Sequence, residues 1–201
     1  MDNMAINRTT EIPTIDVSLV TIQPYGSEDE IAFDTASEVS VEPQVEEADG
    51  VKLIVKGVLK AQKPSSTTLT GNEITLTDNV FSPELVQILQ GGTIYYWVDA
   101  SKTSKSTEVT EYGIAGYTPP VVGSRDKGKS FKMNLYSAQY DAGGNIVQYE
   151  KTTYPNCRSN PVAFNSEDDT FRAPEYTIMS AAKDGEAPYE INYVENLPTI
   201  Q

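Results

Sequence analysis

Residues 123–130 read GSRDKGKS, which has the spacing of a phosphate-binding loop: a Gly, four residues, then Gly-Lys-Ser. In a working loop of this kind, Lys129 would contact the phosphates and Ser130 would bind Mg²⁺. Such a loop needs a strand before it and a helix after it, so that helix N–H groups face the phosphates. Here only TPPVV precedes Gly123, and the following SFKMNLYSAQY (130–140) alternates like a strand. We therefore expect a turn, and a nucleotide hydrolase that depends on Lys129 is the enzymatic alternative.

Other catalytic side chains are scarce. The chain contains no His, which removes the usual general base and the commonest metal ligand. Its single Cys, Cys157, stands beside Arg158, a neighbour that could lower the pKa of a thiol. No His accompanies Cys157 as a base, so we interpret it as a structural or surface residue without catalytic function. We predict that the protein is not an enzyme and takes no cofactor.

Two short acidic clusters, Glu28-Asp29-Glu30 and Glu167-Asp168-Asp169, raise the question of a Ca²⁺ site, since carboxylates are Ca²⁺ ligands. Neither cluster has the ligand spacing of a Ca²⁺-binding helix–loop–helix, and acidic runs usually lie in solvated loops. We predict no metal site.

Tyrosines could instead form a sugar-binding face. The candidates are Tyr112, Tyr117, Tyr136, Tyr140, Tyr149 and Tyr154. Tyrosines in strands more often cover a sheet or an interface. A non-enzymatic β-sandwich that binds a ligand or decorates a capsid therefore remains the second hypothesis.

The elements that would position these residues are mostly strands. Residues 1–12 are polar and predict an N-terminal arm, and 13–201 predict one β domain with long loops. Alternating or β-rich runs occupy 13–22, 51–63, 72–77, 93–100, 130–140, 146–154, 175–182 and 188–198. In residues 51–63, the alternation predicts that Val51, Leu53, Val55 and Leu59 share one face. The expected fold is mainly β: an antiparallel barrel or sandwich.

Only NVFSPELVQILQGG (79–92) has the signals of a helix, which we place at about 83–90. Ser82 is a good N-cap, Pro83 suits the first helical position, and Gly91 suits the end. Phe81, before the cap, can pack on the first turns. Leu85, Ile88 and Leu89 form an apolar stripe, and two turns are stable only when that stripe packs on a sheet.

The chain of 201 residues has 29 acidic and 15 basic side chains, a net charge of −14. This balance is opposite to that of proteins that grip duplex DNA. No stretch is apolar enough to predict a membrane span or a signal peptide, and we expect no membrane partner.

One long stretch resembles a known family. Residues 38–94 contain LTDNVFSPELVQILQGGT, a strand, a Ser-Pro-Glu helix start and a Gly-Gly stop, in the order found in tail tube (major tail) proteins of long-tailed bacteriophages. The closing FRAPEYTIMSAAKDGEAPYEINYVENLP (171–198) is also similar to that family, whereas residues 100–165 show no resemblance.

The resemblance implies a barrel-like fold with a flanking helix, and hexameric rings stacked into a hollow tube that double-stranded DNA traverses. It implies a place in the virion tail, assembled in the bacterial cytoplasm. The implied partners are further copies of the chain and the tape measure, tail terminator and distal tail proteins. Related tubes occur in contractile tails and injection machines; we favour the non-contractile version.

Two sets of charged residues acquire roles under this hypothesis. Acidic side chains that line the bore would repel DNA and keep it sliding; the candidates are Glu38, Glu42, Glu46 and Glu47. Basic side chains could pair with acidic residues of a neighbouring subunit; the candidates are Lys52, Lys56, Lys60, Lys63, Arg125, Lys127 and Lys129.

Overall fold

The computed structural model describes residues 14–27, 30–33, 36–124, 128–164, 168, 173–183 and 185–200. The predicted N-terminal arm, 1–12, lies outside these residues. The strands are β1 (Thr14–Pro24), β2 (Ile31–Phe33), β3 (Ala36–Ala48), β4 (Val51–Val55), β5 (Val58–Lys63), β6 (Ser66–Asp78), β7 (Thr93–Trp97), β8 (Lys105–Ser106), β9 (Ile114–Thr118), β10 (Phe131–Tyr140), β11 (Ile146–Ser159), β12 (Ala163–Phe164), β13 (Pro174–Ser180) and β14 (Glu190–Val194). The described helix is α1 (Pro83–Gln90). The mainly β class with one short helix is confirmed.

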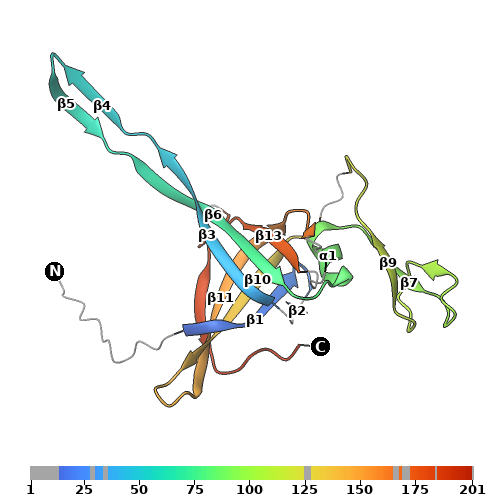
Figure 1. The fold of residues 1–201 in the computed structure, drawn as a ribbon. Helices are drawn as coiled ribbons and strands as arrows, with labels where there is room; N and C mark the ends of the chain where they lie inside the picture. The colour runs from blue at the N-terminus through green and yellow to red at the C-terminus, as the bar shows by residue number, and fades with distance from the viewer. Residues whose placement is uncertain are drawn as a thin grey trace.

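The body of the molecule is a nine-stranded antiparallel sheet with the order β2-β1-β10-β11-β13-β6-β3. Two further strands extend it: β12 pairs with β13, and β14 pairs with β11. The sheet curls so that β3 comes back beside β1, which forms an open barrel (Figure 1). The strands expected near 175–182 and 188–198 are present as β13 and β14. They do not pair with each other but both pair with β11, at different positions along it.

The core fills the inside of this curled sheet. Alternate residues of β1, β6, β10 and β13 point inward, as the two-residue period of strands requires. The fully buried side chains include Val20, Ile22, Ile74, Leu76, Phe131, Met133, Tyr176 and Ile178. Phe33 from β2 meets Tyr176 edge to face, with 5.4 Å between ring centroids. This continuous apolar interior holds the body together.

Helix α1 closes one end of the core, and its predicted punctuation is confirmed. Ser82 is the N-cap, accepting a hydrogen bond from the Leu85 N–H at 3.4 Å, and Pro83 occupies the first helical position. The N–H of Gly91 donates to the Gln87 carbonyl at 2.9 Å, and a φ of 85° at Gly91 ends the helix. Leu85 and Leu89 are buried; Ile88 and Phe81 pack against the same core cluster.

A second, three-stranded sheet of β7, β8 and β9 projects from the body beside α1 (Figure 1). Tyr117 of β9 joins this sheet to the helix: its hydroxyl donates to the Gly91 carbonyl at 2.6 Å and accepts from Gln90 Nε2 at 2.8 Å. The C-terminal end of α1 is thereby tied to β9.

Strands β4 and β5 form a two-stranded sheet of their own, which projects far from the body (Figure 1). The chain reverses at Lys56 and Gly57, whose φ values are 53° and 81°. Two positive φ values in a two-residue loop match the twist of an antiparallel hairpin. The predicted common face of Val51, Leu53, Val55 and Leu59 is wrong, because the turn and a bulge after Leu53 place Leu59 opposite Ile54. We call residues 51–63 the projecting hairpin.

Candidate interaction surfaces

The described residues that follow the GSRDKGKS motif do not form the helix that a phosphate-binding loop requires. Ser130 leads directly into strand β10, where a P-loop would begin a helix. The Lys129 N–H donates to the Ile88 carbonyl at 3.0 Å, which places the segment at the C-terminal end of α1. That end carries the negative pole of the helix dipole and disfavours phosphate. Lys129 itself is exposed, and Arg125 and Lys127 lie outside the described residues.

Gly128 explains part of the apparent motif. A Cβ built on Gly128 would lie 1.8 Å from the Leu89 carbonyl oxygen, so only a Gly allows the segment to approach α1 this closely. The Gly-Lys pair in the sequence is therefore accounted for by packing against the helix.

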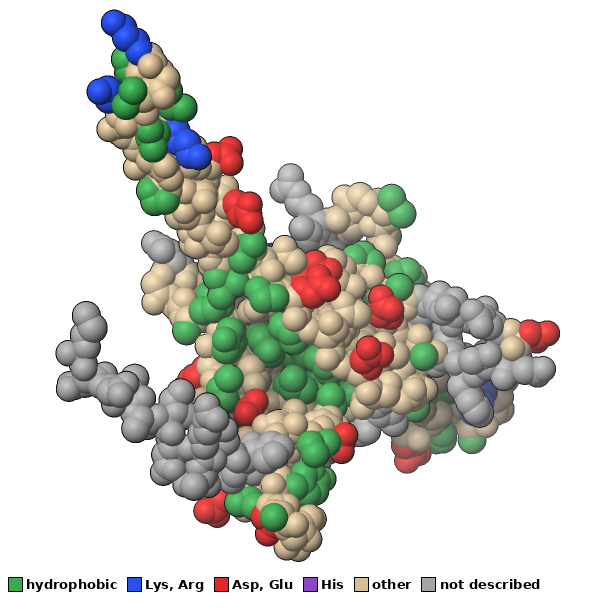
Figure 2. Space-filling model, turned by 60° about the vertical axis from the view of Figure 1, so that its left-hand side comes forward, with side chains coloured by type: hydrophobic (Ala, Val, Ile, Leu, Met, Phe, Trp, Pro, Cys, Tyr) green, Lys and Arg blue, Asp and Glu red, His purple; other side chains and the backbone are tan. Residues whose placement is uncertain are grey.

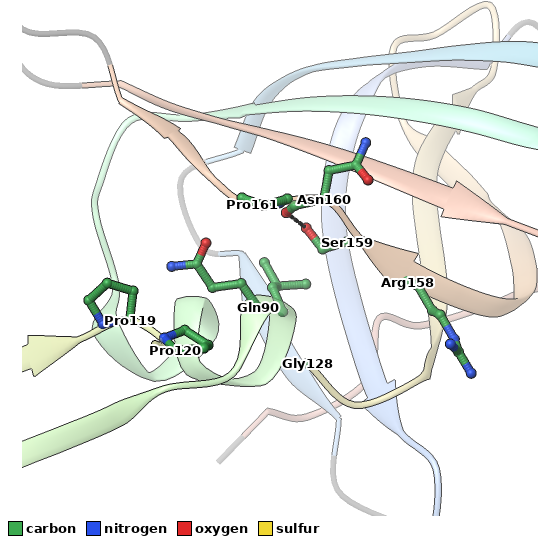
Figure 3. A pocket seen from close by; sticks show the side chains of 9 residues that line it. Gln90, Pro119, Pro120, Gly128, Arg158, Ser159, Asn160 and Pro161 are labelled. Atoms are coloured by element: carbon green, nitrogen blue, oxygen red, sulfur yellow. Dashed lines mark hydrogen bonds between the residues drawn. The ribbon is translucent and has the colours of Figure 1, made fainter. Parts of the chain in front are cut away.

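A cavity of about 380 Å³ lies beside this contact (Figure 3). Its lining residues are Leu89, Gln90, Pro119, Pro120, Gly128, Arg158, Ser159, Asn160 and Pro161. Several polar groups at the cavity already have partners: Gln90 Oε1 accepts from the Val162 N–H at 2.9 Å, and Arg158 Nε donates to Ser130 Oγ at 3.2 Å. Figure 3 shows the Arg158 side chain directed away from Gln90, Pro119 and Pro120. No acidic residue is among the described lining residues.

Cys157 is a core residue, which decides between the structural and the surface position that the sequence left open. Its side chain is fully buried, and the thiol donates to the Tyr154 carbonyl at 3.3 Å. Burial raises the pKa of the Cys157 thiol to about 12, although hydrogen bonds from Ser180 and the Met133 backbone oppose the shift. A neutral, inaccessible thiol cannot act as a nucleophile at physiological pH.

The acidic clusters give no metal centre in the part of the chain that the structure describes. Glu30 accepts a hydrogen bond from Thr21 Oγ1 at 2.8 Å and pairs with Lys151 at 3.9 Å. Glu28, Asp29, Glu167 and Asp169 lie outside the described residues.

The six tyrosines do not form one face. Tyr136 and Tyr154 are buried, at 2% and 6% exposure, and Tyr117 is occupied with the end of α1. Burial raises the pKa of both Tyr136 and Tyr154. These six tyrosines therefore do not provide the common exposed face that the sugar-binding hypothesis requires.

The four acidic candidates on β3 are all exposed but separate into two places. Glu38 and Glu42 lie over the body, opposite Thr77 and Glu73 of β6. Glu46 and Glu47 lie beyond a bulge next to Gln44, at the base of the projecting hairpin, and successive strand residues point to opposite faces. The structure therefore does not bring all four carboxylates onto one surface.

The lysine candidates of residues 51–63 do come together. Lys52, Lys56, Lys60 and Lys63 are exposed on the projecting hairpin, and none of them makes an ion pair within the described chain. The hairpin contains no acidic residue, so its formal charge is +4. Because the whole chain carries −14, the remaining residues together carry −18. Figure 2 shows the Lys side chains at the far half of the projection and acidic side chains over its base and the body.

The same hairpin exposes an unusual number of apolar side chains. Val51, Leu53, Ile54, Val55, Val58 and Leu59 are each 43–64% exposed. A two-stranded hairpin has no interior of its own, so it gains little from these residues in the free chain. The sequence pattern predicted a strand here, but it missed the reversal at Lys56-Gly57; a Gly inside an alternating run was the available signal.

A second exposed apolar strand lies on the body. β14 pairs with β11 from Tyr149↔Val194 to Thr153↔Glu190, and no described strand covers its other edge. Tyr189, Ile191 and Tyr193 are 44%, 46% and 59% exposed. Glu190 and Glu195 are exposed at the two ends of the strand. We call this edge with its side chains the β14 edge.

Among the residues that the structure describes, no helix has the length and apolar character needed to cross a membrane.

Comparison with known proteins gives matches to solved structures only. No family model and no curated protein matches the chain. Similar solved chains come from an anti-feeding prophage baseplate (11% identity, TM-score 0.39, covering 92% of this chain and 97% of that one) and from a PVC extracellular contractile injection system in its extended state. In that system, the sheath-tube complex matches at 14% identity and TM-score 0.39, covering 92% and 95% of the two chains. A chain of the sheath/tube terminator matches at 13% identity and a TM-score of 0.40, and the match covers 91% of this chain and 99% of that one.

Proposed function

We propose that this protein is a structural subunit that assembles with itself into stacked hexameric rings, forming the tail tube of a phage particle through which double-stranded DNA passes. The observation that carries this proposal is the projecting hairpin. Six apolar side chains and four lysines are exposed on a hairpin that projects away from the body (Figure 1). Exposed apolar surface of this kind marks a site of protein association.

The length of the projection suits a contact between subunits. From Val45, after which every residue up to the turn is exposed, to Lys56 is eleven residues, or about 35 Å at the rise of a strand. That distance is comparable to the diameter of a small domain. A contact between the hairpin of one copy and the body of the next is heterologous, and repeated heterologous contacts form closed rings or open stacks.

The charge of the body suits the passage of DNA. Duplex DNA carries about one negative charge per 1.7 Å, and a basic bore would hold it through counterion release. Carboxylates repel DNA over a Debye length of about 8 Å. Glu38 and Glu42 on the body, and Glu46 and Glu47 near the hairpin, are the candidate bore residues.

The test is negative-stain electron microscopy of the full chain, compared with a variant in which residues 49–65 are replaced by Asn-Gly. Asn-Gly is a good two-residue hairpin loop, and Ala48 and Ser66 are cross-strand neighbours. We expect rings or tubes from the full chain, and folded monomers from the shortened one. A full chain that stays monomeric at high concentration, with or without a tail initiation complex, contradicts the proposal and favours a binding module.

A further inference from the structure

The projecting hairpin and the β14 edge both have strand edges without a partner strand. β4 and β5 pair only with each other, so both outer edges of the hairpin carry backbone N–H and C=O groups without a strand partner in the described chain. The outer edge of β14 is in the same condition. An open edge of this kind can accept another strand through main-chain hydrogen bonds.

The side chains of the two surfaces are complementary as well. Both expose large apolar residues: Leu53 and Ile54 on the hairpin, Ile191 and Tyr193 on β14. Their charges have opposite sign, with four lysines on the hairpin and Glu190 and Glu195 at the ends of β14. Lys183, near the start of β14, is already paired with Glu186 at 3.9 Å.

The charges also select among the available pairings. Two hairpins side by side would bring lysines against lysines, and two β14 edges would bring glutamates against glutamates. Like charges opposed across an interface disfavour both of these pairings. Of these three pairings, the one between the hairpin and β14 joins edges of opposite charge.

The two surfaces cannot meet within one chain, because the hairpin projects away from the body that contains β14 (Figure 1). We propose that an edge of the projecting hairpin of one copy adds as a strand to the β14 edge of a second copy. This inference rests on the proposed self-assembly and identifies the two surfaces that make one of its contacts. The joined strands form a sheet that continues across the interface, with the lysines near Glu190 and Glu195.

Disulfide trapping tests the contact directly. The only native thiol, Cys157, is fully buried and does not compete. Leu53→Cys on β4 and Ala61→Cys on β5 leave all four lysines in place, and Asn192→Cys lies in the centre of β14. We expect a covalent heterodimer when the Asn192→Cys chain is mixed with one of the two hairpin variants under mild oxidation. The matched control replaces Asn192→Cys with Glu108→Cys, at an exposed position between β8 and β9, and should give no dimer.

Charge reversal then tests the selectivity. Lys60→Glu with Lys63→Glu in the hairpin chain should lower the yield of the trapped dimer about tenfold, as should Glu190→Lys with Glu195→Lys in the β14 chain. Combining the two reversed chains should restore the yield.

The possible outcomes separate this inference from the proposed function. Rings without trapping between the hairpin and β14 overturn the contact but leave self-assembly standing. Trapping without rings or tubes keeps the contact and rejects the tube. Trapping at Asn192 that is insensitive to both charge reversals keeps the contact and overturns the role of the charges in selecting it.

Discussion

Leu76 in the body and Leu53 in the projecting hairpin are the same residue type, each in an alternating strand, yet their surroundings are opposite. Leu76 is 0% exposed, enclosed by the curled sheet and α1, whereas Leu53 is 55% exposed. The body buries its apolar residues in its own core, whereas the hairpin leaves its apolar residues exposed to solvent. Apolar alternation therefore has two outcomes in this chain: in the body it builds the core, and in the hairpin it leaves the apolar side chains exposed.

The largest effect should come from removing an apolar side chain in the two places. Leu76→Ala should lower the free energy of unfolding by about 2–5 kcal/mol, because it loses buried surface and leaves a cavity. Leu53→Ala should change it by less than about 0.5 kcal/mol in the monomer. Urea unfolding followed by circular dichroism, at a concentration where the protein sediments as a monomer, measures both. Equal losses would mean that the hairpin packs on the body in solution.

A smaller effect should follow from a methyl group at Gly128. In Gly128→Ala, the overlap with the Leu89 carbonyl forces the segment away from α1 and breaks the bond from the Lys129 N–H to Ile88. We expect a loss of about 1–3 kcal/mol, and a thermal midpoint lower by several degrees. The control is Gly116→Ala in β9, whose Cβ would meet no atom within 4 Å. Similar midpoints for the two variants would show that the body tolerates the shift and that the tight contact is not needed.

The smallest effect should be the pH dependence of stability that the buried Cys157 thiol causes in the body. The folded pKa of Cys157, about 12, lies above the ordinary value of 9.0, so the folded state favours the protonated thiol. Its contribution to stability is complete below pH 9 and is lost as the pH rises from 9 toward 12. The urea concentration at the midpoint of unfolding should therefore decrease as the pH is raised from 9 to 10.

Cys157→Ala, which has no thiol to titrate, provides the comparison. It should be less stable throughout but show a shallower fall over the same pH interval. Burial also raises the pKa of Tyr136, Tyr154 and Tyr176. Ionisation of these phenols therefore lowers the stability of both proteins further at higher pH. Parallel curves for the two proteins between pH 9 and 10 would exclude a contribution from the thiol.

Local sequence was sufficient where a structure depends on neighbouring residues. Ser82, Pro83 and Gly91 specify the beginning and end of α1 within one turn of their own positions. The alternation in 130–140 predicted β10, and the mainly β class followed from the number of such runs. The absence of His and the net charge of −14 are properties of composition and need no fold.

Tertiary structure decided everything that depends on which strands meet. The same alternating pattern describes Leu53 and Leu76, and only the curvature of the sheet determines which one is enclosed. The reversal at Lys56-Gly57 moved Leu59 opposite Ile54, because a turn changes which residues share a face. The apparent phosphate loop was resolved by the approach of Gly128 to α1, a contact between segments about forty residues apart along the chain. β14 was predictable as a strand, but its open edge follows from pairing with β11, which lies far away in sequence.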